Sequence, residues 1–104
     1  MILTTIPTVP GREIAEVLGL ARGNTIRAKH IGTDFVASLR NLVGGEVSEY
    51  TKMMAESREQ AVDRMIRDAQ GMGADAIVGV NITTAMVLQG TAEILAYGTA
   101  VKLR

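Results

Sequence analysis

The sequence contains no cysteine, no tryptophan and a single histidine, His30. Without cysteine, the chain has no disulfides, thiolate metal ligands, cysteine nucleophiles or thiol redox chemistry. One histidine also leaves the serine and threonine residues without a His–acid partner that could turn them into nucleophiles. We therefore expect a protein that is not an enzyme.

Aromatic residues and net charge are scarce as well. Only Phe35, Tyr50 and Tyr97 are aromatic, and 11 basic residues balance 11 acidic ones. Nucleic-acid binding draws on a positive field for the phosphates and on aromatic platforms for the bases, so we expect no nucleic-acid partner. Flavin stacking relies on large aromatic rings, tryptophan above all, and we expect no cofactor.

The chain also lacks export and membrane signals. Residues 1–7 have neither the positive start nor the long apolar run of a signal peptide. No stretch approaches the roughly 18 consecutive apolar residues of a membrane-spanning helix. We expect a cytoplasmic protein without membrane contact, folded as a single domain over residues 1–104, because domains of about 100–150 residues are the commonest.

Hydrophobic periodicity and turn residues predict the order of the elements. A short strand is expected over residues 2–6, before Pro7 and the turn at Pro10-Gly11. The other expected elements are a strand over 13–28, a short helix over 33–43, a long helix over 48–71, and strands over 74–84 and 93–103.

The long helix has the clearest pattern. Its opposite faces differ, because one is charged and carries the oppositely charged pairs Lys52–Glu56 and Asp63–Arg67 at a spacing of four. The other face is a mainly apolar stripe, expected to pack on a sheet, of Tyr50, Met53, Met54, Ser57, Ala61, Met65, Ile66 and Ala69.

The last two strands differ in their patterns. The strand over 93–103 is apolar on both faces, which suits a central position, and its small residues Ala96, Gly98 and Ala100 would let a helix lie close. The strand over 74–84 alternates, and we expect one face to carry Ala76, Val78, Val80 and Ile82.

Connection rules then give a topology. The last two strands are expected to form a hairpin, and the helical pair is expected to be a right-handed crossover between parallel strands. The final strand then lies between the other two. The result is an α+β fold, a two-layer β-α-β-β subunit whose antiparallel or mixed three-stranded sheet, of order 1-3-2, packs on one long and one short helix.

Two features of this fold predict assembly. A chain this small has no layer left to cover the second sheet face, and a three-stranded sheet leaves two open edges. Residues 2–6 are not needed by the three-stranded core, so we expect this short strand to pair with the edge of a neighbouring subunit. If each subunit donates to the next, the contact closes into a ring or grows into a filament.

Several runs resemble the YbjQ-like family of small bacterial proteins, a family also called "putative heavy-metal-binding". They are Gly44-Gly45-Glu46 with Tyr50-Thr51, Ala61, the run from Gly73 to Val80, and the run from Tyr97 to Val101. The resemblance covers nearly the whole chain. It implies a subunit similar to that of dodecins, with sheet order 1-3-2, and a homopentameric ring. It implies no established activity.

Metal ligation has little support in the residues. Soft metals prefer thiolate or thioether ligands and hard ones prefer clustered carboxylates, whereas His30 is isolated. Met53 and Met54 could offer sulfur, but methionines at helical spacing usually fill a core. No metal ligand is therefore assigned, although a ring could gather several copies of one residue at its axis.

A basic run is the strongest candidate for ligand binding. Arg22, Arg27, Lys29 and His30 lie along the end of a predicted strand, ahead of a helix expected to begin near Thr33. Helix N-termini attract anions, so a phosphate or carboxylate ligand is conceivable. A solvated strand end explains the same residues, because scattered basic residues are common on surfaces.

Two functions follow from these expectations. The first is a non-enzymatic, homo-oligomeric binding or scaffolding role with an unknown ligand. The alternative is a binder of a metal ion or a small molecule, such as a small anion, in pockets between subunits.

Overall fold

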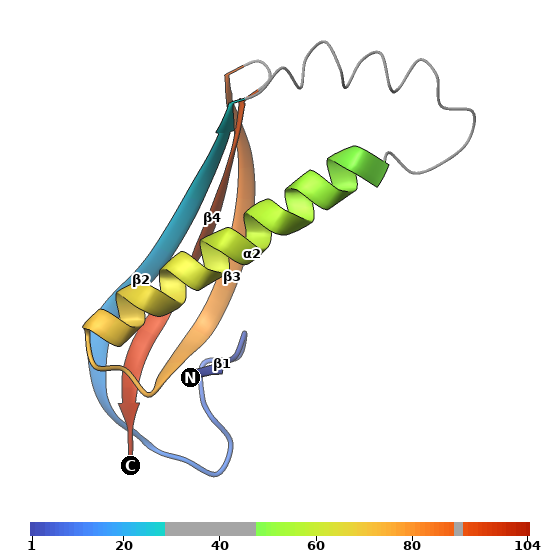
Figure 1. Cartoon of the computed structure of the whole chain (residues 1–104). Coiled ribbons are helices and arrows are strands. Elements are labelled where there is room, and N and C mark those ends of the chain that lie inside the picture. Colours follow the sequence, from blue (N-terminus) through green and yellow to red (C-terminus); the bar gives the residue numbers. More distant parts are fainter. Residues whose placement is uncertain (29–47, 89–90) are drawn as a thin grey trace.

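The computed structural model describes residues 1–28, 48–88 and 91–104. Within these ranges the elements are four strands and one helix (Figure 1). In chain order they are β1 (Ile2–Leu3), β2 (Ile14–Ala28), α2 (Ser48–Gly71), β3 (Ala76–Leu88) and β4 (Thr91–Leu103). The helix has the bounds predicted for it, whereas the predicted short helix over 33–43 lies outside the described residues.

The four strands form one mixed sheet in the order β1-β3-β4-β2. β4 is antiparallel to both of its neighbours, β2 and β3. The predicted order 1-3-2 of the three long strands is confirmed, with the doubly apolar strand in the centre. Buried and half-buried residues run along almost the whole of β4, as expected for a strand with a neighbour on each side.

The N-terminal strand corrects one prediction. Ile2 and Leu3 pair in parallel with Ala76 and Ile77 of β3 in the same chain, so the sheet has four strands rather than three. Further hydrogen bonds run from the Thr4 amide to the Ile77 carbonyl (3.0 Å) and from the Gly79 amide to the carbonyl of Ile6 (3.0 Å). Residues 2–6 therefore cover the β3 edge of their own chain, and their predicted pairing across a subunit boundary was wrong.

A local turn makes this pairing accessible. The Arg12 amide donates to the Val9 carbonyl (3.0 Å), and Gly11 between them has a φ of 81°. The turn reverses the direction of the chain between β1 and β2. The segment that joins the two strands can therefore be short while β1 lies beside β3. Val9 then covers the sheet face opposite α2, in a second apolar cluster with Ala76, Val78 and Val101. Part of the face assigned to another subunit is thus covered by the chain's own N-terminal segment.

A bulge in β3 corrects the predicted side-chain alternation. The register with β4 shifts between Val78 and Asn81, and Gly79 has a φ of 62°. A positive φ is accessible to glycine and strained for other residues, so Gly79 suits the position of the extra residue in a bulge. After the bulge, the side chains of β3 face the opposite side of the sheet from the one that simple alternation predicts. Val80 consequently packs against the cluster under the helix, whereas Val78 belongs to the cluster on the opposite face.

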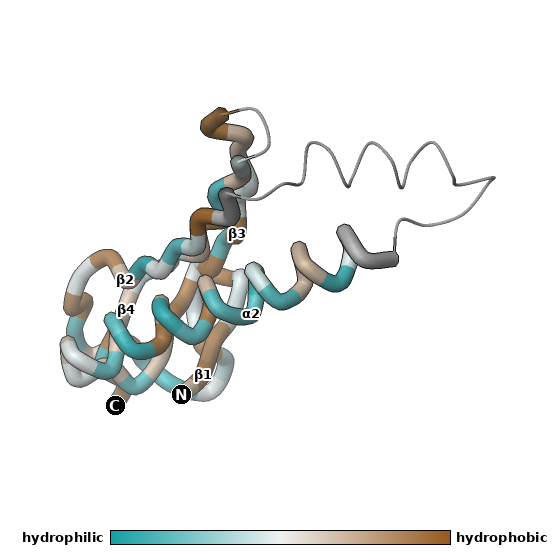
Figure 2. Tube along the Cα trace, turned by 45° about the horizontal axis from the view of Figure 1, so that its top comes forward, coloured by the Kyte–Doolittle hydropathy of each residue, from teal (hydrophilic) through white to brown (hydrophobic). Residues whose placement is uncertain are grey.

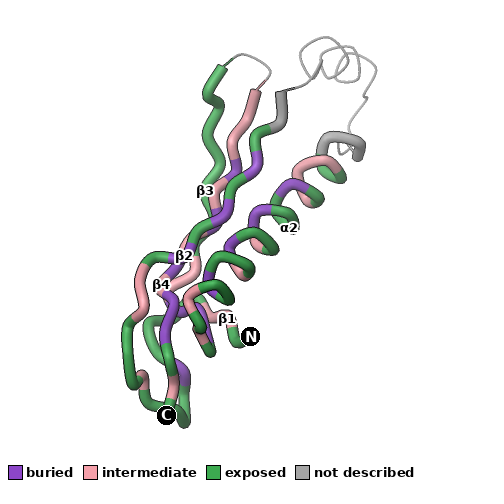
Figure 3. Tube along the Cα trace, turned by 60° about the vertical axis from the view of Figure 1, so that its left-hand side comes forward, coloured by how far each residue is buried: buried purple, intermediate pink, exposed green. Residues whose placement is uncertain are grey.

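β3 and β4 extend beyond their predicted ends. Strand structure continues to Leu88 and resumes at Thr91, where a connection over 85–91 was predicted. Every residue from Asn81 to Leu88 is exposed, and Figures 2 and 3 show this end of β3 projecting away from the helix-covered core. The molecule is accordingly elongated, with extents of 54 × 25 × 16 Å.

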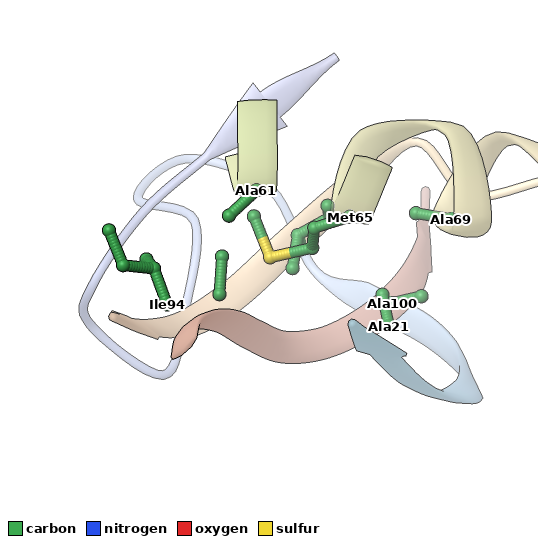
Figure 4. Close-up of a cluster of buried hydrophobic side chains, with 8 residues drawn as sticks. Ala21, Ala61, Met65, Ala69, Ile94 and Ala100 are labelled. Carbon is green, nitrogen blue, oxygen red and sulfur yellow. The ribbon is translucent and has the colours of Figure 1, made fainter. Parts of the chain in front are cut away.

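The core lies between α2 and the sheet (Figure 4). Met65 and Ile77 are its largest members with no exposed surface. Four members of the predicted helix stripe are confirmed as fully buried, namely Ser57, Ala61, Met65 and Ala69, while the side chain of Tyr50 lies outside the described part of the structure. Ala96 and Ala100 of β4 belong to this packing, as predicted, whereas a Cβ at Gly98 would meet Ile77, Val78 and Val80 of β3 rather than the helix. The buried cluster consists of Ala21, Ala61, Met65, Ala69, Ile77, Ile94, Ala96 and Ala100.

Candidate functional site

An open hollow of about 790 Å³ lies beside β2, where the edge of the sheet meets the charged face of α2. Its lining comes from three elements: Arg22, Gly23 and Asn24 of β2, Arg64, Arg67 and Asp68 of α2, and Glu93 and Leu95 of β4.

Gly23 is the reason that strand and helix approach so closely here. A Cβ atom at this position would collide with the backbone of Met65, Ala61 and Arg64. Only glycine therefore lets β2 press against the helix backbone at this point. The close approach brings the side chains on the neighbouring surface of α2 within reach of the strand edge.

Two helix side chains bind the outward-facing backbone of β2. The Arg22 amide donates to Asp68 Oδ2 (3.0 Å), and Arg64 Nη1 donates to the Asn24 carbonyl (2.6 Å). An edge strand with free amides and carbonyls is a template for pairing with another chain. The helix thus occupies the β2 edge at both of these groups.

Three arginines give the hollow a surplus of positive charge. Asp68 already accepts the Arg22 amide, and Glu93 Oε2 accepts the side-chain amide of Asn24 (3.2 Å). The guanidinium groups of Arg22 and Arg67 make no hydrogen bond or ion pair with any residue of the described ranges. The predicted ion pair between Asp63 and Arg67 of α2 does not form either. No residue of the described ranges therefore holds the Arg67 guanidinium group in place.

The structure places the predicted ligand-binding residues unequally. Arg22 lines the hollow. Arg27 lies near the end of β2, where its backbone is paired with Ala92 of β4, and its side chain is outside the described part of the structure. Lys29 and His30 lie outside the described residues.

Sequence reasoning missed Arg64 and Arg67. Both belong to the charged face of the long helix, which the periodicity assigned to solvent. Their spacing of three places them on one side of the helix, and this was the available signal. Their approach to Arg22 depends on how the helix lies across the sheet, which the periodicity does not encode.

The described residues contain no group of three or more histidine, cysteine, aspartate or glutamate side chains that could hold a metal ion.

Tyr97 lies opposite Arg22 in the pairing of β2 and β4 and is half-buried. No described helix is long and apolar enough to cross a lipid bilayer.

A second surface of interest is the outer edge of β3 from Asn81 to Leu88, which we call the distal edge. β1 pairs with β3 only at Ala76 and Ile77, and within the described part of the chain no strand pairs with the distal edge. Its side chains are largely apolar, and four of them are well exposed: Ile82 (43%), Met86 (72%), Val87 (51%) and Leu88 (69%).

β2 adds exposed apolar side chains on the sheet face that α2 leaves open. Alternate residues of this strand, Ala21, Gly23 and Thr25, are buried beneath the helix. Leu20 (55% exposed) and Ile26 (59% exposed) have the opposite alternation and remain accessible. Arg22 and Asn24 share this alternation and lie between the two apolar side chains, so the β2 surface is mixed, whereas the distal edge is largely apolar.

Comparisons with known proteins place these features in a family context. Residues 1–104 match the model of the YbjQ_1 family, described as "Putative heavy-metal-binding". A "UPF0145 protein" of Archaeoglobus fulgidus is 56% identical over 104 residues, which cover 100% of this chain and 96% of the relative. A UPF0145 protein of Methanosarcina acetivorans is 57% identical over 103 residues, covering 99% of this chain and 97% of the relative.

A solved structure supports the fold. It is the crystal structure of a Pediococcus pentosaceus protein described as having unknown function and belonging to the DUF74 family. The TM-score is 0.61 at 18% sequence identity, and the match covers 100% of this chain and 98% of the other. At this identity the likeness shows that the two chains share a fold.

Proposed function

Because the chain belongs to the YbjQ_1 family, described as "Putative heavy-metal-binding", we propose that it is a non-enzymatic binding or scaffolding protein that works as a homo-oligomer. The proposed assembly is a homopentamer, as the family resemblance implies. The single observation that carries the proposal is the distal edge.

The distal edge has the properties of a strand that pairs with another chain. Residues 81–88 contain no charged residue and no proline, the two devices that most often protect an edge strand. The opposite edge of the sheet differs, because Asp68 and Arg64 already occupy backbone groups of β2. The two edges are therefore unequal, which supports a contact in which different surfaces of two copies meet.

Such a head-to-tail contact must close into a ring or continue as a filament. The exposed apolar side chains of β2, Leu20 and Ile26, offer a second surface that a neighbouring copy could cover. Burying them together with the distal edge would remove apolar area from water, at about 25 cal/mol per Å². We propose closure at five subunits.

Light scattering on the untagged protein tests the proposal. We expect a mass five times that of the 11.1 kDa chain. The variant Met86→Glu places a charge in the distal edge and is expected to yield smaller species. Gln70→Glu, which adds the same charge on the exposed face of α2, is the matched control and should leave the mass unchanged. A monomer at micromolar concentration would contradict the assembly, and an unchanged Met86→Glu oligomer would contradict the role of the edge.

The alternative function is a binder of a metal ion or a small molecule in pockets between subunits. The arginine-lined hollow beside β2 lies within one chain, so it supports the choice of a small anion as ligand but not a position between subunits. Native mass spectrometry of the untagged protein separates the two functions, because it reports subunit number and any retained mass together. A retained small molecule or metal ion would favour the alternative.

A further inference from the structure

We propose that the hollow beside β2 binds a small organic anion through a phosphate or carboxylate group held by Arg22, Arg64 and Arg67. All the lining residues belong to one chain, so the site does not rest on the proposed assembly. Guanidinium groups recognise both kinds of anion with the same forked geometry.

The first support is that one guanidinium is already positioned. Arg64 Nη1 donates to the Asn24 carbonyl at 2.6 Å, which fixes the side chain at the strand edge. A guanidinium has five N–H donors, so one backbone contact leaves most of them for a ligand. A preorganised arginine loses less conformational freedom on binding than a mobile one.

The second support is unneutralised charge. Asp68 and Glu93 each accept a hydrogen bond from a neutral amide, that of the Arg22 backbone and that of the Asn24 side chain. The lining therefore contains three arginines and two carboxylates, and both carboxylates already accept a hydrogen bond. Within the described residues Arg67 has no counter-ion, and a bound anion would supply one.

The third support is the size and lining of the hollow. Its volume of about 790 Å³ is typical of a small-molecule site, since such sites span about 300–1,000 Å³. Leu95 adds an apolar surface to the polar lining. This combination suits a small organic molecule with one anionic group and a less polar body better than it suits a bare inorganic ion.

The test uses two probes, phosphate and citrate, each titrated into the intact protein at fixed ionic strength and followed by amide chemical shifts. We expect saturable shifts at Arg22, Gly23 and Asn24. Arg67→Gln should weaken binding about tenfold, because it removes a ligand-facing charge that makes no contact in the described structure. Arg58→Gln is the matched control on the same helix, exposed and outside the lining, and should bind normally.

The outcomes separate specific binding from charge screening. A response to phosphate alone would assign the ligand a phosphate group, and a response to citrate alone would assign it carboxylates. Equal weakening by Arg67→Gln and Arg58→Gln, or shifts that do not saturate with either probe, would overturn the site. The Met86→Glu variant should retain binding, so failure of the site and failure of the assembly are distinguishable.

Discussion

Gly23 affects the geometry of the hollow more directly than any charged residue that lines it. A methyl group at this position would meet the backbone of Met65, Ala61 and Arg64, and backbone cannot move aside as a flexible side chain can. The glycine therefore determines the distance between β2 and α2. Through that distance it determines whether Asp68 and Arg64 reach the strand edge.

Gly23→Ala is accordingly expected to destabilise the protein by about 1–3 kcal/mol or more, the usual range for overpacking. Urea unfolding at a fixed protein concentration measures the effect. Gly71→Ala is the control, because a Cβ there meets nothing within 4 Å and the backbone is not in the positive-φ region. Equal midpoints for the two variants would show that strand and helix are not in the contact described.

α2 has a role beyond covering the core. Its buried stripe packs on β2 and β4, while Arg64 and Asp68 on its neighbouring surface bind the exposed edge of β2. A free β2 edge would offer a second place for strand pairing and a route to uncontrolled association. The helix thereby leaves the distal edge of β3 as the more accessible strand edge of the described sheet.

Removal of one of these bonds should be visible at the amide it protects. In Asp68→Ala the Arg22 amide loses its acceptor, and we expect its hydrogen exchange to accelerate about fivefold to tenfold, equivalent to about 1 kcal/mol for one hydrogen bond. Asp63→Ala, an exposed carboxylate of the same helix, should leave that amide unchanged. Exchange of the Arg22 amide at the same rate in both variants would argue against its hydrogen bond to Asp68.

At the scale of the whole molecule, the family description raises the question of metal binding. The chain has no cysteine, its one histidine has no neighbouring ligand in sequence, and the described residues form no cluster of metal-binding side chains. Zinc and copper are held mainly by such ligands. Only an assembly could bring several copies of one residue together at an axis.

We therefore predict no stoichiometric tight binding of zinc or copper by the intact untagged protein. Isothermal titration calorimetry measures it. Sub-micromolar affinity at one ion per subunit that is abolished by His30→Ala would contradict the prediction. Tight binding that survives this substitution would contradict it as well, and would point to methionine or carboxylate ligands.

Interactions between near neighbours in the chain were accessible from the sequence. The bounds of α2 followed from its apolar stripe, from Ser48 as the residue that caps its start and from Gly71 and Gly73 at its end. The central place of β4 followed from its two apolar faces. One member of the candidate site, Arg22, was identified because basic residues cluster along β2. Each of these inferences uses residues within a few positions of one another, so periodicity and composition carry the information.

Contacts between distant segments required the folded chain. The pairing of β1 with β3 joins residues more than seventy positions apart, and it depends on a turn whose direction no periodicity specifies. The bulge at Gly79 places the Val80 side chain on the opposite sheet face from Val78, because the pairing of β3 with β4 shifts its register between Val78 and Asn81. Arg22, Arg64 and Arg67 line one hollow because Gly23 admits the helix backbone. Such contacts depend on the packing of whole elements against one another, and side-chain packing selects among arrangements that the local pattern leaves equally favourable.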